Sequence, residues 1–362
     1  MSENIIKKIS DCLLGLNGNI TLGIDGCVDE VWKVVETRSG LNEFTLYSKM
    51  EKLGEAIVKC KEGGFAHEIV RVRRTYGGFT GNTSNAVSCL GLKPVMLGTF
   101  GEDTIDPVFE QFNDRCELVS LGATDICQIY EFEDGKIMFP FLGVALNFNW
   151  ESLQKNAEFR RVEEVLLNSE LIALGYWSSM PAFDELVSKI CENYVEAGKC
   201  KKMFFDFADL RKRDRKALGY TLENLAKLNE IVPMILSLNE NEAELLFSYY
   251  GLDFDEREME KTLVDVRRKV GISEVVVHTP HIAAASSDKE GFTTAKNRYC
   301  PSPVITAGAG DTFNGGYLVA TLGMLNIKER LIVANATTAF YVRNGYAPNV
   351  EELIAELKYC VS

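Results

Sequence analysis

The chain has 362 residues, of which 39 are basic and 52 acidic, so its formal net charge is −13. A surface this acidic repels polyanions, which makes nucleic acids and anionic membranes poor candidate partners. Hydrophobic residues make up 46% of the chain and charged residues 25%, a composition typical of a globular protein with a large core.

The N-terminal segment and the cysteines favour a cytoplasmic protein. Residues 1–17 mix charges into the apolar positions and show no cleavage site of a secretory signal. No run of about 18 apolar residues occurs, so we expect no membrane-spanning helix. The ten cysteines are scattered without a Cys-x-x-Cys pair, as reduced thiols would be. Pro280 interrupts His278-x-x-His281, which argues against a helical metal site.

Short apolar runs alternate with amphipathic stretches, a pattern typical of βαβ units around a mostly parallel sheet. The predicted core strands are Ile20–Ile24, Pro94–Gly98, Leu171–Leu174, Lys202–Asp206, Met234–Leu238 and Glu274–Thr279. The predicted helices are Asn82–Leu90, Val108–Arg115, Phe183–Ala197, Leu222–Ile231, Glu240–Tyr250 and Glu256–Val270. We therefore expect a single doubly wound α/β domain over residues 1–362.

Two segments interrupt this rhythm, at about residues 30–76 and 126–141. The first contains a helix-like stretch, Tyr47–Lys61, between strand-like Trp32–Thr37 and His67–Thr75. The second alternates polar and apolar residues around Asp134-Gly135, which is a strong hairpin signal. Small antiparallel flaps on a parallel core are typical of lids, although surface decoration without function would look the same.

The strongest functional signal is Thr306–Gly316, a run of small residues that leads into an apolar stretch. Gly308, Ala309 and Gly310 allow a ligand to approach the backbone, and the next helical turn offers unpaired N–H groups. Such a helix start stabilises a phosphoryl group during transfer. Asp311 could accept the proton of an attacking hydroxyl, although an Asp that only caps the helix would look the same.

Two further segments indicate a ligand rich in hydroxyls. Tyr76–Ala86 places three glycines and two asparagines, among them Gly78 and Asn82, at a predicted helix start. Asp29 follows the first predicted strand, near the sheet edge where open α/β sheets bind ligands. Its carboxylate can accept hydrogen bonds from two neighbouring hydroxyls, although a turn residue is an equally good interpretation.

Together these segments resemble the ribokinase-like (PfkB) carbohydrate kinase family. The family's motifs follow in order: the strand with Asp29, Gly77-Gly78-x-x-Gly81-Asn82, Asn239-x-x-Glu242, and Gly308-Ala309-Gly310-Asp311. The resemblance covers essentially the whole chain. It implies a ribokinase-like, doubly wound α/β fold with a small β lid that closes over a sugar.

The resemblance also implies a reaction, the transfer of the γ-phosphoryl group of Mg-ATP to a hydroxyl of a small sugar, sugar acid or nucleoside. The implied catalytic residues are Asp311 as general base and Gly308, Ala309 and Gly310 as the anion hole. The implied acceptor-binding residues are Asp29, Gly78 and Asn82. The implied nucleotide-binding residues are Asn239, Thr279 and Asn335, and Glu242 is implied to hold Mg²⁺ through water.

Three positions depart from the family's pattern. His278–Ala283 replaces the usual Thr-x-Gly-x-x-Gly, and Ile305–Ala307 replaces the Asp-Thr-Thr tied to a monovalent-cation site. Thr80 stands where Gly or Ala is usual, which predicts an altered sugar pocket. Two alternatives therefore stay open: an ADP-dependent sugar kinase of the same superfamily, and a sugar- or nucleotide-binding member without catalytic activity.

The lid is predicted to be longer than is usual in the family. Arg71, Arg73 and Arg74 could present guanidinium groups on one strand face and bind an anionic acceptor, although solvated lid residues would read the same way. Exposed lid strands also suggest a homodimer formed through the lid.

Overall fold

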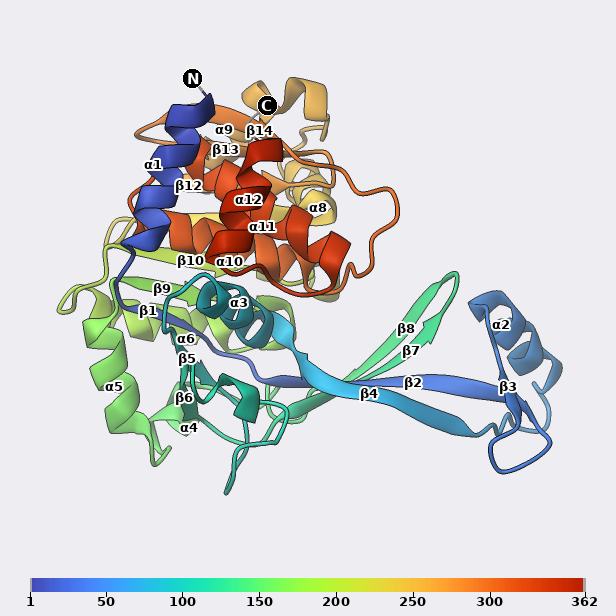
Figure 1. Ribbon diagram of the computed structural model, residues 1–362. Coiled ribbons are helices and arrows are strands. Elements are labelled where there is room, and N and C mark those ends of the chain that lie inside the picture. Colours follow the sequence, from blue (N-terminus) through green and yellow to red (C-terminus); the bar gives the residue numbers. More distant parts are fainter. Residues whose placement is uncertain (1, 361–362) are drawn as a thin grey trace.

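The structure, a computed structural model, describes residues 2–360 and contains two separate sheets (Figure 1). The larger has nine strands in the order β14-β13-β12-β11-β10-β9-β1-β5-β6. Its strands are β1 (Ile20–Gly23), β5 (Val95–Gly98), β6 (Glu117–Ser120), β9 (Leu171–Leu174), β10 (Lys202–Asp206), β11 (Met234–Asn239), β12 (Glu274–His278), β13 (Ile282–Ser287) and β14 (Gly291–Lys296). The strands from β12 to β6 pair in parallel, and β13 and β14 add an antiparallel edge.

Helices cover both faces of this sheet. One face packs against α1 (Ser2–Leu14), α3 (Gly78–Cys89), α10 (Ala309–Leu322), α11 (Ile327–Asn344) and α12 (Val350–Cys360). The other packs against α4 (Trp150–Gln154), α5 (Phe159–Asn168), α6 (Phe183–Ile190), α7 (Arg215–Leu228), α8 (Glu240–Tyr249) and α9 (Met259–Val270). Successive residues of a strand alternate between the two cores: Leu171 and Ala173 face the first, Ile172 and Leu174 the second. Because both faces are buried, the strands read as continuous apolar runs.

The predicted core strands are confirmed, with ends that agree to within one residue. Two predicted helices begin earlier than expected, since α3 starts at Gly78 and α7 at Arg215, whereas α9 starts later than expected, at Met259. The predicted helix Val108–Arg115 is wrong. Successive backbone bonds there span three residues, such as Phe112 N to Phe109 O at 3.0 Å, so the segment forms turns around the short 3₁₀ helix η1 (Glu110–Phe112).

The remaining short helical turns connect strands to the longer helices. They are η2 (Trp177–Ser179), η3 (Cys191–Val195, a π-helical turn), η4 (Leu210–Lys212) and η5 (Glu256–Glu258). Within residues 2–360, no helix has both the length and the apolar character needed to cross a membrane.

The smaller sheet, which we name the lid, projects from the body as a long arm (Figure 1). Its strands are β2 (Cys27–Arg38), β3 (Phe44–Leu46), β4 (Ile69–Gly77), β7 (Asp125–Phe132) and β8 (Gly135–Phe141). β2 pairs with β4, β3 and β7, and β7 and β8 form the hairpin predicted at Asp134-Gly135. The helix α2 (Met50–Lys59) lies at the far end of the arm, where the Met50 N–H donates to Asp134 Oδ1 at 2.8 Å.

Candidate active site

The sequence-predicted catalytic residues lie at the carboxyl edge of the large sheet. Parallel strands end at the same edge, so β1, β10, β11 and β12 deliver their following residues to one place. The starts of α3 and α10 meet at this edge, because Asn82 Nδ2 on α3 donates to Asp311 Oδ2 on α10 at 2.9 Å. Residues more than 200 positions apart in the chain, the predicted acceptor residue and the predicted base, are therefore in direct contact.

The start of α10 is shaped by Gly308, the residue that caps it. Gly308 has φ +74°, and a Cβ there would lie 3.2 Å from Tyr341 Oη and 3.3 Å from Asn82 Cγ. Both the conformation and the space favour glycine. Ala309, Gly310 and Asp311 form the first turn. The Ala309 N–H donates to the Thr306 carbonyl at 3.2 Å, while the N–H groups of Gly310 and Asp311 have no helical acceptor and are suited to bind an anion.

Burial raises the pKa of Asp311 well above its usual range, and the charges of Asp206, Asp25 and Asp29 raise it further. The hydrogen bond from Asn82 acts in the opposite direction. A carboxylate in such a dry and negative environment is a stronger base than one in water.

Two more carboxylates, Asp206 and Glu242, lie near Asp311 at the ends of β10 and β11. Asn239 and Glu242 form a capping box at the start of α8: Glu242 N donates to Asn239 Oδ1 at 3.1 Å, and Asn239 N donates to Glu242 Oε2 at 3.0 Å. Glu242 Oε1 is buried without a partner. Burial and then the charge of Asp206 raise the pKa of Glu242 well above its usual range.

Asp206 is a site residue that the sequence analysis missed. Its Oδ2 accepts from Asn314 Nδ2 on α10 at 2.9 Å, and its Oδ1 accepts from Ala208 N at 2.7 Å. Burial raises the pKa of Asp206 to about 6. Its position as the last residue of a predicted strand, one strand away from Asn239-x-x-Glu242, was the available signal.

Asp29 lies in strand β2 of the lid rather than in a turn, opposite Thr75 and Cys127. A Cβ on Gly77 would lie only 2.5 Å from Asp29 Oδ1, so the carboxylate lies directly against the glycine pair. Burial raises the pKa of Asp29 to about 6, although Lys136 and Arg73 lower it. The three predicted acceptor residues Asp29, Gly78 and Asn82 therefore lie along the joint between the lid and α3.

Asp25 is a second missed residue, just after β1. Its Oδ1 accepts from Thr80 N at 2.9 Å and from Thr80 Oγ1 at 2.6 Å. Thr80, the residue that departs from the family's pattern, thus fixes a carboxylate that is only 2% exposed. No signal beyond the departure at Thr80 pointed to it in the sequence.

Two predicted nucleotide residues make contacts within the protein. The Thr279 hydroxyl donates to Glu256 Oε1 at 2.6 Å and accepts from His281 N and Ile282 N, which closes a tight turn after β12. Asn335 is 1% exposed, and its Nδ2 donates to the Ala295 and Lys296 carbonyls while its Oδ1 has no partner. Their contact with a nucleotide stays a prediction.

The lid arginines do not share one strand face, because Arg73 and Arg74 are consecutive in β4 and their side chains point to opposite faces. Arg71 and Arg74 both contact Glu30, each at 3.3 Å, and Arg74 also pairs with Asp106 at 2.6 Å. Arg73 pairs with Glu131 at 3.0 Å. The prediction that all three arginines share one strand face is therefore wrong, and their binding of an anionic acceptor stays a prediction.

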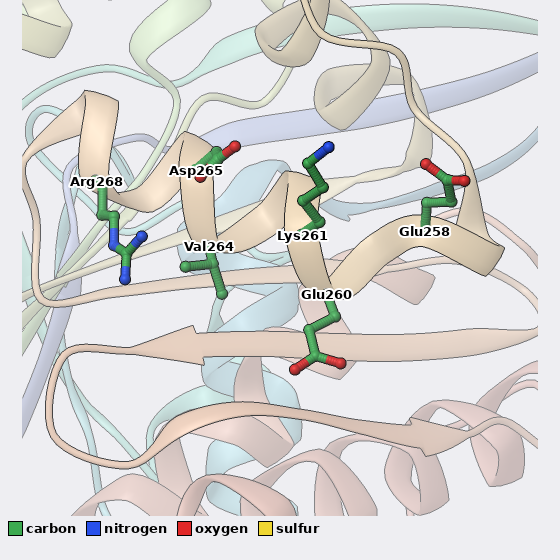
Figure 2. A pocket seen from close by; sticks show the side chains of 6 residues that line it. All are labelled: Glu258, Glu260, Lys261, Val264, Asp265 and Arg268. Atoms are coloured by element: carbon green, nitrogen blue, oxygen red, sulfur yellow. The ribbon is translucent and has the colours of Figure 1, made fainter.

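A surface hollow of about 610 Å³ lies apart from this edge. The side chains lining it all come from η5 and α9 (Figure 2): Glu258, Glu260, Lys261, Val264, Asp265 and Arg268. None of the predicted site residues lines it, so the chemistry is not located there.

Comparison with known proteins identifies the family and the fold. A family model described as prokaryotic ketohexokinase matches residues 8–359. A protein of Haloferax volcanii named ketohexokinase is 26% identical over 366 residues, which cover 98% of this chain and 96% of that protein.

Solved structures of similar fold include the ribokinase of Thermotoga maritima, with a TM-score of 0.64 and 19% identity over 95% of this chain and 100% of that one. The ribokinase of Arabidopsis thaliana in complex with ribose and ATP gives a TM-score of 0.64 and 17% identity, with coverage of 94% and 98%. Phosphofructokinase-2 of Escherichia coli gives 0.62 and 14%, with coverage of 96% and 100%. The ribokinase-like fold predicted from the sequence is confirmed.

The buried pair of Asp206 and Glu242 predicts a specific pH dependence of stability. The pKa of Asp206 is about 6 in the folded protein, above its value in the unfolded chain, so ionisation between about pH 4 and 7 costs stability. As the pH rises from 4 to 7, we expect the free energy of unfolding of Asp206→Asn to increase relative to that of the wild type by on the order of 2 kcal/mol. Urea unfolding at several pH values measures it.

The control is Asp255→Asn, because Arg257 lowers the pKa of Asp255 to about 2 and this group does not titrate in that range. If the stability difference between Asp206→Asn and the wild type stayed constant from pH 4 to 7, Asp206 would not be a buried carboxyl group with a raised pKa.

Proposed function

Because the chain belongs to the prokaryotic ketohexokinase family and is an ATP-dependent carbohydrate kinase, we propose that it phosphorylates a hydroxyl of a ketohexose with Asp311 as general base. The family supports this enzyme over the ADP-dependent kinase and the inactive binding protein left open by the sequence. The observation that carries the proposal is the contact between Asn82 and Asp311 at the start of α10.

Asp311 is placed to accept the proton of the attacking hydroxyl. It lies on the first turn of α10, and Asn82 fixes the orientation of its carboxylate. Asp29 and Gly78 line the joint on the lid side and would hold the other hydroxyls of the acceptor. The raised pKa of Asp311 makes it a better proton acceptor once ionised, and the proton passes to it as the oxygen attacks phosphorus.

The backbone from Gly308 to Asp311 would hold the transferred phosphoryl group. The N–H groups of this turn and the positive end of α10 would offset the negative charge on the phosphoryl oxygens during transfer. This site therefore supplies positioning and electrostatic stabilisation without forming a covalent intermediate.

Glu242 and Asp206 fit a Mg²⁺ ion that accompanies the nucleotide. Glu242 Oε1 is buried without a partner, and the charge of Asp206 raises the pKa of Glu242. Within residues 2–360, no three His, Cys, Asp or Glu side chains are arranged to bind a metal by themselves. Mg²⁺ commonly uses one or two carboxylates together with phosphates and water, so a weak protein site that is completed by nucleotide is expected. When bound, the ion would offset phosphate charge.

Asp311→Asn tests the general base. The variant keeps the size of the side chain and the contact with Asn82, so we expect normal folding and sugar binding. Turnover should fall by about 10²–10⁴-fold, because the amide cannot accept the proton. A coupled assay with D-fructose and Mg-ATP, together with calorimetric sugar binding, measures both. Near-normal turnover would remove Asp311 as the base.

Glu242→Gln tests the metal end. Glutamine can still accept from Asn239 N, so α8 stays capped, but the charge is lost. We expect the Mg²⁺ concentration needed for half-maximal rate to rise by about tenfold or more. The matched control is Glu244→Gln on the exposed side of α8, which should leave the Mg²⁺ dependence unchanged. Equal Mg²⁺ curves for both variants would argue against the assignment.

We also propose that two copies pair through the lid. β8 is an edge strand of the lid sheet, and it exposes Met138 at 45%, Phe139 at 59% and Phe141 at 74%. An apolar edge strand left in water is prone to pair with another chain.

Phe139→Ser combined with Phe141→Ser should convert a dimer into a monomer in sedimentation velocity. The control is Tyr220→Ser, which alters an aromatic side chain that is 63% exposed on α7 of the body. A wild-type protein that sediments as a monomer, or a dimer unaffected by the lid substitutions, would contradict the proposed lid interface.

A further inference from the structure

Asp25 lies against the first turn of α3, a helix start that would otherwise attract an anion. We propose that Asp25 is a specificity-determining residue that excludes phosphorylated and other anionic sugars from the acceptor site. This inference rests on the proposed sugar kinase activity and concerns only which acceptors that site admits.

The first step is the location of the carboxylate. Asp25 Oδ1 is held by the backbone and the hydroxyl of Thr80, in the first turn of α3. A Cβ on Gly78 would lie 1.9 Å from Asp25 Oδ2, so this oxygen lies directly against the glycine that begins the helix. The N-terminus of a helix attracts anions, and here the protein's own carboxylate already satisfies it.

The second step is that no cation among residues 2–360 offsets the charge of Asp25, although the hydrogen bonds from Thr80 lower its pKa. Oδ2 is buried and has no hydrogen-bond partner. Its charge raises the pKa of Asp311, of the Cys27 thiol and of the Tyr176 hydroxyl. The pKa of Asp25 itself is about 6, so the group is ionised in an assay at pH 8.

The third step concerns the cations that could compensate. Arg73 and Lys136 lower the pKa of Asp29, yet burial still keeps that pKa at about 6. Arg73 is already paired with Glu131, and the other two lid arginines pair with Glu30 and Asp106. Asp25, Asp29 and Asp311 therefore leave the acceptor side of the site negative.

Carboxylates accept hydrogen bonds from hydroxyls but repel phosphates and other carboxylates. A neutral polyol can thus bind where an anionic sugar of similar shape meets like charge that Arg73 and Lys136 offset only in part, which is a way to reject a close relative of the substrate. The Thr80 hydroxyl positions Asp25 against α3, whereas the proposed exclusion depends on the charge of Asp25.

The test compares D-fructose with D-fructose 6-phosphate, using Mg-ATP at pH 8 and the wild type, Asp25→Asn and Thr80→Val. Asparagine can still accept from Thr80 through Oδ1 but has no charge. Thr80→Val removes the hydroxyl bond but keeps the charge. The scored quantity is the ratio of kcat/KM for the phosphate ester to that for D-fructose, in which any general loss of folded or active protein cancels.

We expect the wild type to favour D-fructose strongly, Asp25→Asn to raise the ratio by about tenfold or more, and Thr80→Val to leave it near the wild-type value. An unchanged ratio in Asp25→Asn would mean that exclusion is steric and would overturn the proposal. Equal use of both sugars by the wild type would overturn it as well.

Should Asp25→Asn not fold, Asp25→Ser and calorimetric binding of both sugars to the wild type replace it. Binding of the phosphate ester as tightly as D-fructose would then overturn the role of Asp25. No turnover of D-fructose by the wild type would overturn the proposed ketohexose acceptor and with it this inference, whereas turnover with an unchanged ratio overturns only the inference.

Discussion

The removal of carboxylates from water at the carboxyl edge of the sheet is the constraint on which the rest of the site depends. Burial is the largest cause of the raised pKa of Asp25, Asp206, Glu242 and Asp311. Ionising several acids in one dry region is unfavourable, and the cost falls only when hydrogen-bond donors or cations arrive. A site with this character would be stabilised by a substrate rich in hydroxyls at one end and by a metal-bound nucleotide at the other, as the proposed function requires.

The two apolar cores hold that region in place. Asn314, fully buried on α10, accepts from Ser237 of β11 at 2.7 Å and donates to Asp206 of β10. The helix that carries Asp311 is thereby tied to the two strands that carry the proposed metal end. A shift of α10 along the sheet would break these bonds and the Asn82 contact together, so the base and the metal end keep a fixed relation to each other.

Much of the fold could be predicted from the sequence, because both faces of the parallel sheet are buried and its strands read as continuous apolar runs. The hairpin at Asp134-Gly135 was equally readable from its turn residues. The helix expected at Val108–Arg115 was not, since apolar residues at helical spacing also fit a chain of turns packed on the core.

The catalytic motif at Asp311 could be located from local pattern alone, whereas Asp25 and Asp206 could not be assigned. Each follows or ends a strand, but its partners come from distant segments. Asp206 meets an asparagine 108 positions later, and Asp25 meets Thr80, 55 positions later. These contacts depend on the order of the strands in the sheet and on where α3 begins, and neither can be read from the sequence around Asp25 or Asp206. The lid arginines are a different case, because Arg73 and Arg74 are consecutive and point to opposite faces of β4, while the register shift that lets Arg71 and Arg74 contact the same Glu30 is not visible in the sequence.

Both ends of the site concentrate carboxylate charge, but different ligands would stabilise the two ends. At the proposed metal end, a divalent cation that arrives with a nucleotide would offset the charges of Asp206 and Glu242. Between α3 and the lid, Asp25 and Asp29 would face the hydroxyls of an acceptor, which donate hydrogen bonds without adding charge. Asp311 lies between the two ends and belongs to both, since Asn82 orients it from the acceptor side while the charge of Asp206 raises its pKa from the metal side. If Asp206 and Glu242 bind a cation together with the nucleotide, as we propose, the pKa of Asp311 would fall and its carboxylate would be ionised when the phosphoryl donor is in place.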